Sequence, residues 1–162
     1  MDSNNSVILR DSSGHWLRFR NPARIVTATR QADVLPALAE VESAAEGGVF
    51  AAGFIAYEGA SALDRAFRTH ARSPVPLVWF GLYPKPELLS ELPPPVEEYR
   101  VGEWRSMVTR EGYMAAIDRI RQYIAAGDTN QVNYTIRLRT EFSGSAYGLF
   151  HSLVDAQQAP HG

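Results

Sequence analysis

The chain has 162 residues, of which 16 are basic and 18 are acidic, and 45% of its residues are hydrophobic. A chain of this size can bury the core of an ordinary domain, and its near balance of charge gives no broad positive field that would attract nucleic acid. The absence of cysteine excludes disulfides, thiolate nucleophiles and sulfur-ligated zinc, and fits a reducing cytoplasm.

The chain also lacks the patterns that direct proteins to membranes. Its first six residues are polar and have no apolar core of a signal peptide. Its longest apolar runs are shorter than the roughly 20 residues that cross a bilayer. We therefore expect a soluble, cytoplasmic protein that binds neither nucleic acid nor membranes.

The first elements in chain order are short strands followed by a helix. Residues 7–9 and 15–20 have extended patterns, and the turn residues 11–14 between them predict a hairpin. The β-branched run 24–29 predicts another strand. Asp33 is then expected to cap a helix with apolar residues at helical spacing, which ends at the glycines of residues 47–48.

Two apolar runs and a proline-rich stretch come next. Residues 49–57 are apolar without alternation, which predicts a strand covered on both faces at the centre of a sheet. Residues 77–83 predict a second buried strand. Residues 84–98 are rich in proline, and we expect them to form an exposed connector without helix or strand ladder.

The remaining residues predict one more strand near 99–104, a helix between Thr109 and Gly127, an alternating strand over 131–142, and a last helix over about 145–158. Strands and helices thus occur in blocks. This order favours an α+β fold, layered, with a largely antiparallel sheet and packed helices. We expect three parts: a first sheet and helix (1–83), the connector (84–98), and a second region (99–162).

Familiar catalytic motifs are missing. The four histidines have no metal-ligand spacing, and no Gly-x-Ser-x-Gly elbow or phosphate-binding loop is present. Glu58 follows an apolar strand, where it either points into a cleft or caps and pairs with a neighbouring arginine. Arg137 and Arg139 share a polar strand face, which either binds a dicarboxylate or is solvated. The sequence leaves both alternatives open.

Four blocks have a recognisable order and spacing. They are Trp-Leu-Arg-Phe-Arg-Asn-Pro at 16–22, Ala-Ala-Gly-Phe-Ile-Ala-Tyr-Glu at 51–58, Pro-Leu-Val-Trp-Phe-Gly-Leu at 76–82, and Gly-Asp at 127–128 followed by Gln-Val-Asn-Tyr-Thr at 131–135. Together they resemble the anthranilate synthase component I family of chorismate-binding enzymes. Asn133 resembles the residue at this position in aminodeoxychorismate synthase component I, which forms the para-aminobenzoate branch of the family. Asn130 departs from that branch, because it stands where an aromatic residue is common.

The resemblance implies that the chain is the N-terminal portion of such an enzyme and an incomplete half of its sandwich fold. The whole enzyme replaces the 4-hydroxyl of chorismate with ammonia from a glutamine amidotransferase partner, for folate synthesis. Mg²⁺ assists this reaction, and its ligands are expected outside this chain. The nucleophilic lysine of a Pro-Ile-Lys-Gly-Thr segment is absent, because the only lysine is Lys85, between two prolines.

We therefore expect no catalytic and no metal-binding residue in this chain, and no activity of the chain alone. A fragment of anthranilate synthase component I is an alternative. An uncovered sheet edge and apolar patch would favour self-association.

Relatives also bind tryptophan, as the resemblance implies, near their N-terminus. The matching positions here are Ser12, Trp16, Leu17, Arg18, Phe19, Pro160 and His161. Asp11 stands where the family serine is expected, and His161 replaces an aromatic residue; the extra carboxylate would repel a ligand carboxylate. A short amino-acid-binding regulatory module is thus a second possible function, and a purely structural role for these residues is the other alternative.

Overall fold

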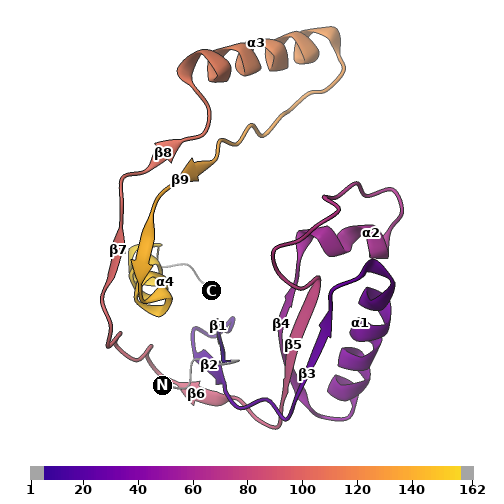
Figure 1. Ribbon diagram of the computed structural model, residues 1–162, viewed down its shortest axis with the longest axis vertical. Coiled ribbons are helices and arrows are strands. Elements are labelled where there is room, and N and C mark those ends of the chain that lie inside the picture. Colours follow the sequence, from indigo (N-terminus) through magenta and orange to yellow (C-terminus); the bar gives the residue numbers. More distant parts are fainter. Residues whose placement is uncertain (1–5, 158–162) are drawn as a thin grey trace. The chain divides into compact units, whose positions relative to one another are not determined.

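The computed structural model describes residues 6–157 (Figure 1). Its described residues contain four α-helices, and their strand pairs are all antiparallel, which confirms the α+β class. The chain divides into two compact units that meet in sequence at Pro93 and Pro94. Each unit is described by itself.

The first unit begins with a small antiparallel sheet. Its strands are β1 (Val7–Arg10), β2 (Trp16–Phe19) and β6 (Glu87–Leu89), in the order β1-β2-β6. The predicted hairpin is therefore correct. Its turn is closed by the Asp11 carboxylate, which accepts hydrogen bonds from the backbone N–H of Ser13 and of His15, both at 2.9 Å.

The presence of β6 corrects the prediction of a connector without ladder over residues 84–98. Three residues, Glu87–Leu89, pair with β2 inside that stretch. They form a strand because none of the three is proline, so their backbone N–H groups can donate. The high proline content of residues 84–98 as a whole therefore did not predict that a few residues between prolines can form a strand.

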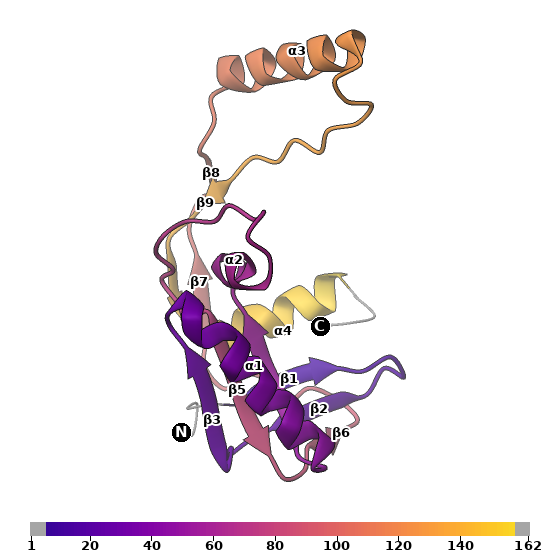
Figure 2. The same cartoon turned by 90° about the vertical axis from the view of Figure 1, so that its right-hand side faces the viewer.

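A second antiparallel sheet carries the core. It contains β3 (Arg24–Ala28), β5 (Val78–Tyr83) and β4 (Phe50–Ile55), in the order β3-β5-β4. Helix α1 (Gln31–Glu46) covers one face, as Figure 2 shows. Buried residues between helix and sheet include Val26, Val34, Val78 and Leu82.

The position of β4 contradicts the expectation that residues 49–57 form a central strand. The central strand is β5, and β4 lies at an edge, with Phe50, Phe54 and Ile55 exposed. An apolar run without alternation does not distinguish a strand buried on both faces from an edge strand with apolar side chains in solvent. Gly53 does allow a close approach, because a Cβ there would meet the Trp79 carbonyl oxygen of β5.

Tyr83, at the end of β5, is completely buried and stacks at an angle on Phe19 of β2, with ring centroids 5.3 Å apart. Its ring folds back over Gly81, where an added Cβ would meet the Tyr83 ring and hydroxyl. Tyr83, Phe19 and Ala52 form a second small core. This core joins the two sheets of the first unit.

Helix α1 begins one residue after Arg30, so the expected cap at Asp33 is wrong. Asp33 lies in the first turn and accepts hydrogen bonds from Arg30, while the N-cap makes no side-chain hydrogen bond to the backbone. The predicted end is correct: the glycine pair ends the helix, and Gly48 has a φ of 84°. After β4, a 3-10 helix, η1 (Tyr57–Gly59), leads into the short α2 (Ala60–Leu63).

The second unit consists of two short strand pairs and two helices. Strand β7 (Tyr99–Val101) pairs with β10 (Phe142–Gly144), and β8 (Arg105–Ser106) pairs with β9 (Leu138–Arg139). Helix α3 (Arg110–Ala126) connects β8 to the segment before β9, and α4 (Ala146–Gln157) follows β10. None of these strands is longer than three residues.

Both predicted ends of α3 are correct. The Thr109 hydroxyl oxygen accepts a hydrogen bond from the Gly112 backbone N–H at 3.1 Å, and Gly127 has a left-handed φ of 81°. The predicted strand over 131–142 is wrong over most of its length, because residues 131–137 have no regular structure. Alternation specifies which side chains share a face, but a strand also needs a neighbouring backbone to pair with.

Within residues 6–157, the structure contains no helix that is both long and apolar enough to span a bilayer.

Candidate functional site

The residues expected to bind an effector lie mainly on β2. Trp16 and Phe19 are buried, with 6% and 4% exposure, and Leu17 and Arg18 are half-buried. Ser12 lies in the hairpin turn and is exposed. Pro160 and His161 lie outside the described residues.

The two faces of β2 have different neighbours. Leu17 and Phe19 pack with Tyr83 in the second core, which is a structural role. Trp16 lies under the Arg10 guanidinium, which is 5.6 Å from the ring centroid. Only the face that carries Trp16 and Arg18 is therefore a candidate surface for a ligand.

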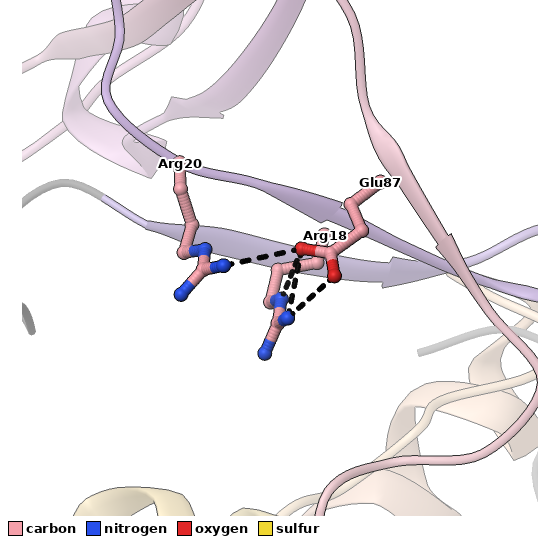
Figure 3. A network of polar contacts seen from close by, with 3 residues as sticks. All are labelled: Arg18, Arg20 and Glu87. Atoms are coloured by element: carbon pink, nitrogen blue, oxygen red, sulfur yellow. Dashed lines mark hydrogen bonds and ion pairs between the residues drawn. The ribbon is translucent and has the colours of Figure 1, made fainter.

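Arg18 is already engaged by a carboxylate. Figure 3 shows Glu87 of β6 bound by Arg18, with Arg18 Nε at 2.9 Å from Oε2 and Arg18 Nη2 at 2.8 Å from Oε1. The Arg20 Nη2 atom also contacts Oε2, at 3.3 Å. Hydrogen bonding from Arg18 lowers the pKa of Glu87 below its ordinary value. Two guanidinium groups share one carboxylate here, so the cluster keeps a net positive charge and can attract an anion.

Asp11, at the position of the family serine, has a local structural role. Its carboxylate accepts hydrogen bonds from the Ser13 hydroxyl at 2.7 Å and from two backbone N–H groups of the turn. The Ser13 hydroxyl is the main cause of the lowered pKa of Asp11. Asp11 thus stabilises the turn that follows β1.

A separate open cavity of about 650 Å³ lies at the other end of the β3-β5-β4 sheet. Residues 29–31, Glu58 and residues 70–77 line it. The sequence left two roles open for Glu58, in a cleft or as a cap and partner of a neighbouring arginine, and in the structure Glu58 lines this cavity. The sequence gave no role to His70 and Arg72, which also line the cavity, because the polar connection that contains them has no motif.

The two arginines expected on one polar strand face are not both in a strand. Arg139 lies in β9 directly opposite Arg105 of β8, beside a hollow of about 200 Å³ that Glu103 and Glu141 also line. Arg137 precedes β9, and its carbonyl oxygen accepts a hydrogen bond from Met107. The arrangement does not present Arg137 and Arg139 as a pair.

Over the range 6–157, no group of three histidine, aspartate or glutamate side chains gathers in a way that could hold a metal ion. Lys85 is exposed and precedes β6, far from the environment that would activate an amine nucleophile.

Comparison with known proteins gives a match over nearly the whole sequence. A family model described as chorismate binding enzyme matches residues 5–162. Aminodeoxychorismate synthase component 1 of Bacillus subtilis (strain 168) is 33% identical over 60 residues, which are 37% of this chain and 13% of that protein. Anthranilate synthase component 1 of Cereibacter sphaeroides is 36% identical over 76 residues, 44% of this chain and 15% of that protein.

A third relative is aminodeoxychorismate synthase component 1 of Escherichia coli (strain K12), 33% identical over 67 residues, 41% of this chain and 15% of that protein. The matched segments thus cover 13 to 15% of the length of these relatives. No solved structure matches the chain.

Proposed function

Because the chain belongs to the family of chorismate-binding enzymes, we propose that it forms the N-terminal portion of an aminodeoxychorismate synthase component I. The family match over residues 5–162 carries this proposal. Two of the three relatives bear this name, and Asn133 supports the same branch. Residues 99–162 would then begin the chorismate-binding region.

In this proposal the whole enzyme is cytoplasmic and aminates chorismate to 4-amino-4-deoxychorismate, a precursor of p-aminobenzoate and folate. A glutamine amidotransferase subunit supplies the ammonia. Mg²⁺ would act as a Lewis acid when bound, and its ligands and the nucleophilic lysine would come from polypeptide other than residues 6–157. In this proposal the chain alone is inactive, and the exposed position of Lys85, its only lysine, supports this.

The uncovered apolar side chains of α3 support a missing covering layer. Helix α3 has no buried residue, and Tyr113 and Ile124, which share one face of it, are 40% and 43% exposed. Apolar patches of this kind bind another surface. We propose that the isolated chain self-associates through them, so that its sedimentation coefficient rises with concentration; a concentration-independent monomer would contradict this.

The reading frame and the reaction test the proposal together. DNA sequencing downstream of the Gly162 codon should show an in-frame Pro-Ile-Lys-Gly-Thr segment. The longer protein, given chorismate, Mg²⁺ and ammonium, should form 4-amino-4-deoxychorismate, whereas the 162-residue chain should form none. Anthranilate as the product would assign the chain to the anthranilate synthase branch, and a stop codon directly after Gly162 would reject the proposal.

Tryptophan binding is a second candidate, supported by the excess positive charge that Arg18 and Arg20 keep around Glu87, next to the strand that carries Trp16. Calorimetric titration of the chain with tryptophan should then saturate. Arg20→Gln should weaken the binding because it removes the less engaged guanidinium. A flat titration would remove this function.

A further inference from the structure

The cavity beside Glu58 is assembled from parts of the first unit that are distant in sequence. Residues 29–31 join β3 to α1, Glu58 lies in η1, and residues 70–77 lead into β5. These segments are tied together at one atom, the Glu58 carbonyl oxygen. It accepts hydrogen bonds from the Gln31 side-chain amide at 2.6 Å and from the Thr69 hydroxyl at 3.3 Å.

The charged side chains around the cavity are not equally available. Arg30 is engaged by Asp33, with Nε at 2.7 Å from one carboxylate oxygen and Nη2 at 2.8 Å from the other. By contrast, no hydrogen bond or ion pair within residues 6–157 engages the side chains of Glu58, His70 or Arg72. Glu58, His70 and Arg72 thus line one cavity, and their side chains do not pair with one another.

The rest of the wall is apolar. Pro74, Val75, Pro76 and Leu77 form a continuous stretch of it, and Val75 is 47% exposed. A volume of about 650 Å³ has room for a small organic molecule. Contact with an aliphatic group would remove this apolar surface from water.

The mixture of charges selects the kind of ligand. A simple anion would be attracted by Arg72 but repelled by Glu58, and a simple cation would meet the opposite problem. A molecule that carries both an ammonium and a carboxylate meets a complementary group for each. We propose that this cavity binds a free aliphatic α-amino acid, with its ammonium at Glu58, its carboxylate at Arg72 and His70, and its side chain against residues 74–77.

This site goes beyond the proposed enzyme function and is separate from the candidate tryptophan site, because none of its lining residues belongs to the candidate effector positions 12, 16–19, 160 and 161. The amino-acid site would remain if the chain proved to belong to another branch of the family. Loss of the site would likewise leave the assignment to the family untouched.

The test is calorimetric titration of the 162-residue chain with L-leucine, and with two molecules that each carry half of its charge, 4-methylpentanoate and 3-methylbutylamine. L-leucine should bind saturably and at least about tenfold more tightly than either half-molecule, because each of these leaves one charged group unpaired. Equal binding of all three molecules, or no binding of leucine, would overturn the proposal.

Substitutions then test whether Glu58 and Arg72 bind the charged groups of leucine. Glu58→Gln and Arg72→Gln should each weaken leucine binding at least about tenfold. Arg68→Gln, in the same connection but outside the cavity lining, should leave it unchanged. Far-ultraviolet circular dichroism and thermal unfolding of each variant establish that it is folded. Glu58→Gln and Arg72→Gln proteins that fold and still bind leucine as tightly as the unmodified chain would reject the site.

Discussion

Helices α1 and α3 are nearly equal in length, with 16 and 17 residues, yet they are stabilised in different ways. Helix α1 has no side-chain cap but buries Val34 and Ala37 against a sheet. Helix α3 has a threonine cap and a left-handed glycine at its end but buries no residue. Every buried hydrophobic residue within 6–157 lies at or before Tyr83. Capping residues therefore determine where a helix begins and ends, whereas burial of its side chains provides most of its stability.

The largest difference in stability between the two units should come from truncating one buried aromatic residue in the first unit and one exposed residue on α3. Tyr83→Ala removes a fully buried ring that packs on Phe19, and should lower the free energy of unfolding by about 3–5 kcal/mol. Ile124→Ala on α3, where the side chain is 43% exposed, should change it by less than about 0.5 kcal/mol. Urea unfolding followed by tryptophan fluorescence measures both. Similar losses of unfolding free energy in the two variants would contradict the view that burial stabilises the first unit but not α3.

The second largest difference in stability between the two units should come from replacing a glycine in each. A Cβ at Gly53 would meet the Trp79 carbonyl and the Phe80 side chain, so Gly53→Ala must separate β4 from β5, at about 1–3 kcal/mol. In the second unit, the nearest atom to a Cβ at Gly102 is the Thr140 hydroxyl oxygen at 3.4 Å. Gly102→Ala is thus the matched control and should unfold at the same urea concentration as the unmodified chain. An unchanged midpoint for Gly53→Ala would show that the strands do not approach so closely.

The cap of α3 should have a smaller and local effect. Thr109→Ala removes the acceptor for the Gly112 N–H and should destabilise α3 by about 1 kcal/mol. Because no buried contact compensates, part of the helix signal in circular dichroism should be lost. Arg30→Ala, at the equivalent position of α1, should leave the helix signal unchanged, since burial holds that helix. Equal losses in both variants would show that burial does not protect α1.

The smallest effect is the pH dependence of the β2–β6 contact. Arg18 lowers the pKa of Glu87 from an ordinary value of 4.5, so the contact stabilises the folded state above about pH 4.5. This contribution is lost as the pH falls through the lowered pKa. The thermal midpoint should thus fall below pH 4.5 less steeply in Glu87→Gln than in the unmodified chain. Parallel curves for the two proteins would exclude a role of this ion pair in acid stability.

Much of the local structure in both units followed from the sequence, because turns, glycines and apolar periods act locally. The hairpin at 11–14 and the ends of α3 at Thr109 and Gly127 are such cases. Sheet order depends on contacts between distant residues, and the pattern of residues 49–57 did not reveal that β4 is an edge strand. Likewise β6, between prolines, and the unpaired segment 131–137 depended on whether a partner backbone was present.

The candidate sites show the same limit. Glu58 was recognised because it follows a strand, but its cavity also needs His70 and Arg72, which reach it through a connection without periodicity. The pairing of Arg18 with Glu87 joins residues 69 positions apart, and no local pattern encodes it. Charges of opposite sign are common in any sequence, so only the fold selects which of them meet.

The fold of Tyr83 over Gly81 couples the sizes of two positions on one strand. The ring occupies the volume that a side chain at 81 would need. When both positions are randomised and folded variants are selected, glycine at 81 should therefore accompany a large aromatic residue at 83, and alanine or serine at 81 should accompany a smaller residue at 83. Divergence along this strand would then proceed by paired replacements instead of single ones.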